Sequence, residues 1–285
     1  MYEAFCRDAG LAEPVWRAME QAPKNRALFA RAVAAVSGRD QESFKAVCQE
    51  GMRRYGAIFT LLALAECYPV TKRYYPDAEV RHATLGDIAI WVRHYGQKTG
   101  AVGADNVSWL CHHACGSITR LGRLQYEEAP FPFAVTIVRD GHGRFTLGGE
   151  DGTTLVLKAG KPCLRLHIPE GGPLYEWEVD DSLAWAARWF SRFPIVVCDS
   201  WLLDPALSQV LSPDSRIIRF QKRFTLFPVP QHGLPQIYER VFGFGLCEQD
   251  VLSFPSVTTL QKRVQEALGK GIRFHSCGGF LALRA

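Results

Sequence analysis

The sequence predicts an α+β protein in which an N-terminal helical bundle is followed by a mixed β-sheet with flanking helices. Apolar residues recur at helical spacing as far as about Tyr126. Beyond Gln125 they form short alternating or wholly apolar runs that are separated by glycine-rich turns. Helices followed by a sheet favour two units. We therefore expect a helical domain over 1–128 and a sheet domain over 129–285.

Apolar faces and end signals place the helices of the first half. Leu28, Phe29 and Ala32 form one face of a helix, and a longer apolar segment that follows is typical of a helix at the centre of a bundle. Thr84 and Asp87 resemble a capping box at the start of another helix. The predicted helices are Asn25–Val36, Glu42–Tyr68, a segment from Thr84 that is stopped by Gly96 and Gly100, and a segment from about Asp105.

In the second half the pattern alternates between strands and helices. Three short runs with glycine-rich turns favour an antiparallel meander, and these are Phe133–Arg139, Arg144–Leu147 and Thr154–Lys158. The further strands expected are Cys163–Ile168, Ile195–Cys198, Ile218–Phe227 and Ile272–Leu283, the last broken at Gly278-Gly279. The helices expected between them begin at Asp180 or Asp181, at Pro205, and at Thr258 or Thr259.

Composition narrows the class of protein. The 285 residues are 47% hydrophobic and 22% charged, which is typical of a globular chain. The 33 basic and 29 acidic residues are mixed along the chain, so we expect no nucleic-acid partner. Nine scattered cysteines indicate a reducing compartment. The N-terminus lacks signal-peptide features, and the most apolar stretch, Ala57–Ala65, is too short to span a membrane. We expect a cytoplasmic protein with no membrane association.

Three stretches of sequence resemble a known family. They are LGRLQY at 121–126, LHIPEGGPL at 166–174 and CDSWLL at 198–203, and RVFG at 240–243 and TTLQKR at 258–263 are similar as well. They resemble a bacterial acyltransferase-like family in which a helical N-acyltransferase N-terminal domain precedes a GNAT-like C-terminal domain. The resemblance spans nearly the whole chain. It implies transfer of an acyl group from acyl-CoA or acetyl-CoA to an amine or hydroxyl of a small-molecule acceptor.

The resemblance also implies where the CoA thioester lies. In a GNAT fold two adjacent parallel strands splay apart, and Cys163–Ile168 and Ile195–Cys198 correspond to them. The pyrophosphate then lies on backbone N–H groups at the start of the intervening helix. The sequence departs from the usual pattern, since no Gln/Arg-x-x-Gly-x-Gly/Ala run follows the first strand. The residues expected to contact the cosubstrate are Ile168, Gly171, Gly172, Ser200, Arg219 and Arg223.

Two residues are candidates for the catalytic base. His167 shares a strand face with Cys163 and Arg165, so it is either a general base in the cleft or a histidine bonded to nearby backbone. Glu170 precedes a glycine pair in a loop, so it is either a base or a solvated carboxylate. Both interpretations stay open for each residue.

Other polar residues carry weaker hypotheses. Arg219 and Arg223 lie on the polar side of a predicted strand, where they would bind phosphate or simply be solvated. Cys198 or Ser200 would serve as the nucleophile of a hydrolase, although no base is recognisable. The cluster Cys111–Cys115 lacks a second pair of ligands, so no metal is expected. The alternative to acyl transfer is a non-catalytic GNAT-like module that binds a ligand or a protein and has lost CoA binding.

Overall fold

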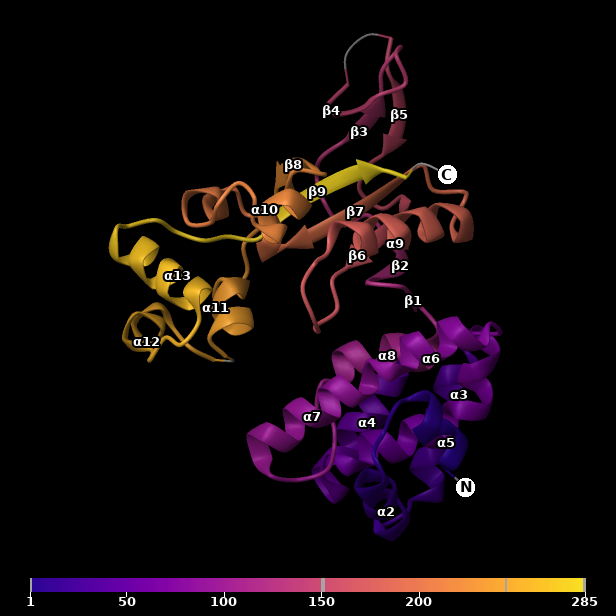
Figure 1. Cartoon of the computed structure of the whole chain (residues 1–285). Coiled ribbons are helices and arrows are strands. Elements are labelled where there is room, and N and C mark those ends of the chain that lie inside the picture. The colour runs from indigo at the N-terminus through magenta and orange to yellow at the C-terminus, as the bar shows by residue number, and fades with distance from the viewer. Residues whose placement is uncertain (1, 150–151, 244, 284–285) are drawn as a thin grey trace. The chain divides into compact units, whose positions relative to one another are not determined.

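The computed structural model describes residues 2–149, 152–243 and 245–283 (Figure 1). The chain divides into two compact units. Unit 1 comprises the residues up to Glu127 together with Ile168–Glu170, and unit 2 comprises Glu128–His167 and the residues from Gly171 onward. A helical region followed by a mixed sheet confirms the predicted α+β class. The domains 1–128 and 129–285 stay a prediction about which parts of the chain fold by themselves.

Unit 1 is a helical bundle around a central helix that is buried over most of its length. Its core includes Phe59, Leu61 and Leu62, all at 0% exposure. They lie on α5, whose apolar residues face all directions as the sequence indicated. The helices are α1 Glu3–Asp8, α2 Glu13–Gln21, α3 Arg26–Ser37, α4 Gln41–Tyr55, α5 Ile58–Tyr74, α6 Ala78–Gly86, α7 Ile88–Thr99 and α8 Val107–Cys115.

The prediction of one continuous helix over Glu42–Tyr68 is wrong, because two helices occupy this segment. α4 ends at Gly56, whose φ of +77° is a conformation that glycine adopts at little cost. The chain turns there, and α5 starts two residues later and packs on α4. Gly51 of α4 lies so close to the ring of Phe59 that a Cβ at this position would overlap it.

The predicted capping box at Thr84 is also wrong. Thr84 is buried inside α6, where its hydroxyl accepts a hydrogen bond from the backbone N–H of Arg120 at 2.9 Å. Asp87 separates α6 from α7, but its carboxylate binds the side chains of Arg120 and Gln125 instead of capping a helix. α7 continues through Gly96 and ends at Gly100, which has φ +71°.

A β-hairpin follows α8, where the helical pattern was expected to continue to Tyr126. β1 Ile118–Leu121 and β2 Leu124–Pro130 pair in antiparallel register from Ile118 opposite Glu127 to Leu121 opposite Leu124. Gly122 at φ +65° begins the two-residue turn. The helix expected from about Asp105 is confirmed in α8, which ends at Cys115 before the hairpin begins.

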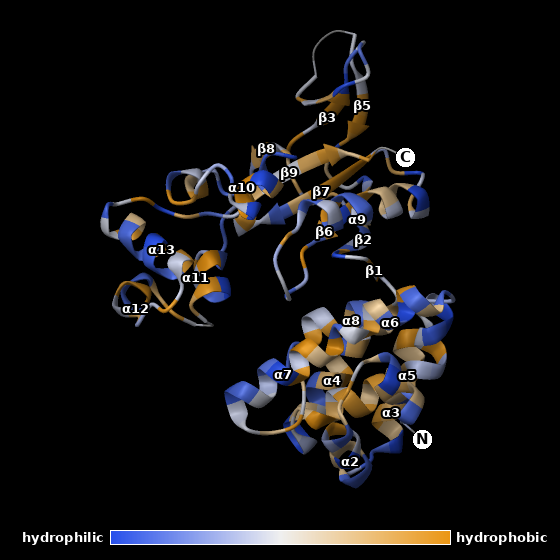
Figure 2. Cartoon of the chain, viewed as in Figure 1, coloured by the Kyte–Doolittle hydropathy of each residue, from blue (hydrophilic) through white to orange (hydrophobic). Residues whose placement is uncertain are grey.

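The main sheet of unit 2 is mixed. β6 Pro162–His167 and β7 Ile195–Ser200 are parallel and are joined by α9 Glu176–Trp189. β9 Cys277–Ala282 pairs antiparallel with β7, and β8 Thr225–Pro228 pairs antiparallel with β9. Hydrophobic colours run along β7 and β9 in Figure 2, as expected for strands covered on both faces. β9 is not broken at its glycine pair, and Gly278 leaves the space that the ring of Phe227 fills.

A second sheet of three strands holds the predicted antiparallel runs, but in a different order. β3 Ile137–Arg139 lies between β4 Phe145–Leu147 and β5 Thr154–Leu157. The predicted meander is therefore wrong, because β5 pairs with β3 instead of β4. Ile137 and Leu157 belong to the same buried cluster as residues of the main sheet.

The rest of unit 2 is mostly helical, and one predicted strand is wrong there. Ile218–Phe227 consists of a helix followed by β8. Ser215 caps that helix by accepting a hydrogen bond from Ile218 N at 3.3 Å. Phe220 and Phe224 alternate like strand residues, but their rings pack on each other at 5.1 Å. The elements are η1 Trp201–Leu203, η2 Pro205–Gln209, α10 Arg216–Gln221, α11 Gln236–Val241, α12 Glu248–Ser253 and α13 Thr259–Gly269.

Of two helix starts predicted in unit 2, one is confirmed and the other is wrong. Thr258 caps α13 and forms a capping box with Gln261, as predicted. α9 begins earlier than predicted, after Tyr175, so neither Asp180 nor Asp181 is its cap. Within the described residues no helix has both the length and the apolar content that a membrane crossing requires.

Two glycine-to-alanine variants test the packing of the bundle. Gly51→Ala should lower the free energy of unfolding by about 1–3 kcal/mol, because the new methyl group overlaps the Phe59 ring. The matched control is Gly86→Ala, since Gly86 is helical and has no atom within 4 Å of an added Cβ. This control should be neutral or stabilising by about 1 kcal/mol at most. Equal effects of both changes in urea denaturation would contradict the packing.

Candidate active site

The parallel strands β6 and β7 part before they end. Their register pairs Leu164 with Val196 and Arg165 with Val197, and among the described residues it goes no further. β6 nevertheless continues to His167 and β7 continues to Ser200. The last residues of β7 stay paired with β9 on the other edge of β7. We call the stretch beyond the last β6–β7 pair, at the carboxyl ends of the two strands, the opening. Ligands of open α/β sheets bind at such edges.

The start of α9 lies at this same edge of the sheet. A helix that connects two adjacent parallel strands runs back antiparallel to them. The first turn of α9 therefore lies near the carboxyl ends of β6 and β7 (Figure 1). Its free backbone N–H groups carry partial positive charge, although Glu176 and Glu178 in the first turn add negative charge.

The side chains at the opening are polar and partly exposed. Arg165 of β6 donates to Asp199 of β7 at 2.9 Å, and the two side chains are 25% and 36% exposed. His167 is the last residue of β6 and is half-buried. Ser200 is 8% exposed, and its hydroxyl accepts a hydrogen bond from Leu202 N at 3.1 Å, which caps η1. Ser200 thus shapes the turn after β7.

The loop after β6 depends on its glycine pair. Gly171 has φ +114° and Gly172 has φ +67°, conformations that strongly favour glycine. No atom lies within 4 Å of a Cβ added at either position, so the backbone is open on that side. An exposed backbone of this kind lets a ligand approach the chain closely.

The arginines expected to bind phosphate, Arg219 and Arg223, contact acids of α9. Arg219 lies in α10 and not on a strand, and it pairs with Glu176 at 3.1 Å and with Asp214 at 3.5 Å. Arg223 lies in the turn after α10 and pairs with Asp180 of α9. These contacts offset the negative charge of α9. The sequence pattern did not reveal the contacts, because the paired residues are far apart along the chain.

The segment Ile168–Glu170 belongs to unit 1 and is fastened there. The carboxylate of Glu170 lies 2.9 Å from Nε2 of His94, whose ring meets Trp91 edge-on. The guanidinium of Arg123 donates to the carbonyl of Pro169 at 2.9 Å. Glu170 is therefore a paired residue, although 54% of its side chain stays exposed. His94, which lies 76 residues away, could not be identified as its partner from spacing.

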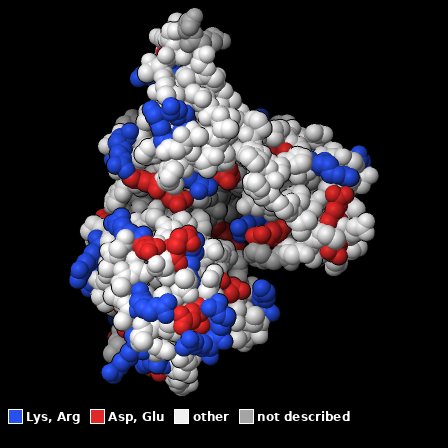
Figure 3. All heavy atoms as spheres, turned by 180° about the vertical axis from the view of Figure 1, so that it is seen from behind, with Lys and Arg blue, Asp and Glu red and all other residues white. Residues whose placement is uncertain are grey.

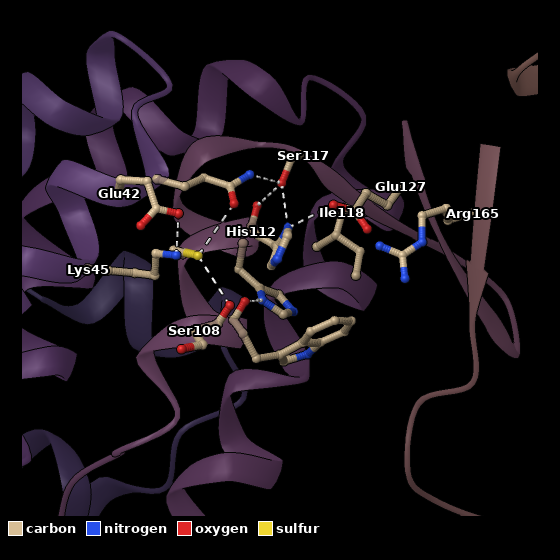
Figure 4. A network of polar contacts seen from close by, with 12 residues as sticks. Glu42, Lys45, Ser108, His112, Ser117, Ile118, Glu127 and Arg165 are labelled. Atoms are coloured by element: carbon tan, nitrogen blue, oxygen red, sulfur yellow. Dashed lines mark hydrogen bonds and ion pairs between the residues drawn. The ribbon is translucent and has the colours of Figure 1, made fainter. Parts of the chain in front are cut away.

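The histidines of the Cys111–Cys115 cluster have separate roles in unit 1 (Figure 4). Nδ1 of His112 lies 3.2 Å from the carboxylate of Glu127 and 3.0 Å from the hydroxyl of Ser117. His113 is fully buried, with Nδ1 3.3 Å from a backbone carbonyl. Both cysteines are buried, and burial raises the pKa of the Cys111 thiol to about 11. Among the described residues, no three His, Cys, Asp or Glu side chains form a group that could hold a metal ion.

Charges of both signs alternate over the surface. On the face shown in Figure 3, Lys and Arg side chains are interspersed with Asp and Glu. No single-sign field marks that face as a binding surface for a polyanion.

Thiol reactivity tests the hydrolase hypothesis. Burial raises the pKa of the Cys198 thiol far above its usual range, whereas Cys247 alone among the nine cysteines, all within the described residues, is exposed. Iodoacetamide should therefore modify one thiol of the native chain, Cys247, and Cys247→Ser should remain almost unlabelled. Rapid alkylation of Cys198, mapped by mass spectrometry, would contradict this and support a nucleophilic role.

The comparison with solved structures finds acyltransferases. The chain superposes with a TM-score of 0.75 and 26% identity on an acyltransferase crystallised with decanoyl-CoA and teicoplanin, over 99% of this chain and 88% of that one. A structure of an acyltransferase with CoA and 10C-teicoplanin matches at 0.75 and 25%, with the same coverage of both chains. A mutant acyltransferase with octanoyl-CoA, at 24% identity and a TM-score of 0.64 over the full length of both chains, shows the fold alone.

Two sequence families divide the chain between them. Residues 5–116 match the N-acyltransferase N-terminal domain, and residues 118–281 match the GNAT-like C-terminal domain. No curated protein matches the sequence. The resemblance carried by residues 121–126, 166–174 and 198–203 is confirmed, and the chain belongs to the acyltransferase family that joins an N-acyltransferase N-terminal domain to a GNAT-like C-terminal domain.

Proposed function

We propose that this protein transfers an acyl group from acyl-CoA to an amine or hydroxyl of a small-molecule acceptor. The observation that carries the proposal is the early end of pairing between β6 and β7, after Arg165 and Val197. This opening has the position and the parallel strands that a thioester carrier needs in a GNAT-like fold. The family membership supports the reaction class, and the relatives crystallised with decanoyl-CoA or CoA support the donor.

The chain's own residues fit such a donor. Beyond Val197, the described part of β7 has no ladder partner in β6, and a ligand can extend along this edge of the strand. The open backbone at Gly171 and Gly172 can approach phosphate closely. Arg219 is paired with Glu176 at the start of α9. This pairing reduces the electrostatic repulsion of an anion at the helix N-terminus, which the sequence alone did not indicate. Ile168, Gly171, Gly172, Ser200, Arg219 and Arg223 remain the proposed cosubstrate contacts.

The proposed reaction is a direct attack. The acceptor's lone pair forms a bond to the thioester carbonyl carbon, backbone N–H groups stabilise the oxyanion, and the C–S bond then breaks to release CoA thiolate. The acceptor's proton passes to a base, which is His167 or Glu170. His167 ends β6 at the opening, whereas Glu170 hydrogen-bonds with His94 and would act together with it. The bound teicoplanin of one relative supports a small-molecule acceptor.

A second candidate function is a ligand-binding module that has lost CoA binding. The acidic first turn of α9, with Glu176 and Glu178, favours it, because carboxylates at a helix N-terminus compete with pyrophosphate. The two functions differ in one measurable property, which is the affinity for acyl-CoA.

Calorimetric titration with acetyl-, octanoyl- and decanoyl-CoA separates the two functions. We expect at least one of them to bind with micromolar affinity, about −8 kcal/mol, as is ordinary for a cosubstrate. Circular dichroism of the titrated protein, compared with protein refolded from urea, serves as the control that the sample is folded. Native protein that binds none of the three donors would contradict acyl transfer and favour the non-catalytic module.

The turnover rates of variants at His167 and Glu170 identify which residue accepts the proton. His167→Ala should slow acyl transfer by about 10²–10⁴-fold if His167 is the base, with acyl-CoA affinity nearly unchanged. Glu170→Gln should then have a much smaller effect, and the reverse result would assign the role to Glu170. His142→Ala is the matched control, since His142 is exposed in the turn between β3 and β4. Unchanged turnover in both variants would exclude both residues as the base.

A further inference from the structure

Two large aromatic side chains are exposed at the edge where β6 and β7 part. Tyr175 directly precedes α9 and is 40% exposed, and Trp177 in the first turn of α9 is 64% exposed. Tryptophan is highly buried on average, so a ring that is nearly two-thirds exposed at a candidate site needs an explanation. The α9 crossover places both residues near the carboxyl ends of the two strands.

A cation already covers one of these rings. The guanidinium of Arg216, the first residue of α10, lies 4.6 Å from the centroid of the Tyr175 ring. A guanidinium over an aromatic face is attracted by the quadrupole of the ring. Its N–H groups point outward in the plane of the guanidinium, where they can still donate hydrogen bonds. Tyr175 and Arg216 therefore form a ready-made pair of a flat surface and a positive charge.

Arg216 differs from its neighbours in charge pairing. Arg219 and Arg223 are both paired with carboxylates. Within the part of the chain that the structure describes, no carboxylate pairs with Arg216. A guanidinium without an acid partner keeps its five donors for a ligand, and its planar fork suits a phosphate.

We propose that Tyr175, Trp177 and Arg216 bind the adenosine 3′-phosphate end of CoA. The inference rests on the proposed function, since it names the contacts of the donor that the opening receives. An adenine ring supplies the π-face that an exposed Trp stacks on, and the 3′-phosphate supplies the anion that Arg216 lacks. An uncharged aromatic acceptor would leave Arg216 without a partner. Of the two acidic residues beside Trp177, Glu176 is paired with Arg219, which reduces its repulsion of the phosphate, and Glu178 adds negative charge to the same turn.

Binding of CoA and of 3′-dephospho-CoA to the whole chain tests the proposal, because the two ligands differ in that phosphate alone. Calorimetry should give CoA an affinity about tenfold or more above that of dephospho-CoA. Arg216→Gln should remove this preference and leave the dephospho-CoA affinity nearly unchanged. Trp177→Ala should weaken both ligands by about fivefold or more, which is the range of base–aromatic stacking.

Two matched variants lie at the other end of α9. Trp189 is 42% exposed and Arg188 lies in the last turn, so Trp189→Ala and Arg188→Gln remove the same side-chain types away from the strand opening. Both should bind CoA and dephospho-CoA as the unmodified protein does. Thermal unfolding of all four variants should be unchanged within a few degrees, because each altered side chain is exposed.

The outcomes separate the two proposals. Equal affinity of the unmodified protein for both ligands, or losses in the α9 C-terminal variants that equal those of Arg216→Gln and Trp177→Ala, would overturn the subsite while leaving acyl transfer intact. A rise in the KM of the acceptor with unchanged CoA affinity would assign the aromatic residues to the acceptor and also overturn it. Absence of binding of either ligand to the folded protein would overturn the proposed function together with the subsite.

Discussion

The candidate site depends on the unequal hydrogen bonding of β7 along its two edges. β7 pairs with β9 along its whole length, from Ile195 opposite Ala282 to Ser200 opposite Cys277. It pairs with β6 only at Leu164–Val196 and Arg165–Val197. One edge of β7 is thus held in the sheet while the other is released, and this asymmetry opens the sheet without unfolding it.

The residues around the opening maintain this geometry by different means. Gly278 in β9 leaves room for the ring of Phe227 in β8, which lies opposite it in the antiparallel pair. The segment Ile168–Glu170, which follows β6 and belongs to unit 1, contacts His94 and Arg123 within that unit. The strand that parts from β7 is therefore followed by a segment with its own anchoring contacts, and not by a slack loop.

Local patterns predicted most of the elements, whereas the contacts between distant residues were beyond them. The apolar run of α5 and the Thr258 cap of α13 were visible because both depend on neighbouring residues. Gly56 was missed as a helix boundary, since its φ of +77° is decided by the packing of α4 on α5. In Ile218–Phe227, rings at i and i+4 imitated strand alternation, and the cap at Ser215 was the signal that a helix precedes β8.

In the candidate site too, local features were predicted from the sequence and contacts between distant residues were not. The two strands and the glycine loop were predicted from short motifs, and the structure brings them to one edge of the sheet. The pairing of Glu170 with His94, of Arg219 with Glu176 and of Arg216 with Tyr175 joins residues that are 40 or more apart in the sequence. A single sequence carries no record of such contacts, so the charge balance at the start of α9 became visible only in the structure.

A crystal structure with a non-hydrolysable acyl-CoA analogue tests the central claim most directly. We predict that the thioether and pantetheine of the analogue lie between β6 and β7, beyond Arg165 and Val197. An analogue bound elsewhere on the chain, with β6 and β7 joined by continuous ladder pairing as far as His167 and Ser200, would contradict it.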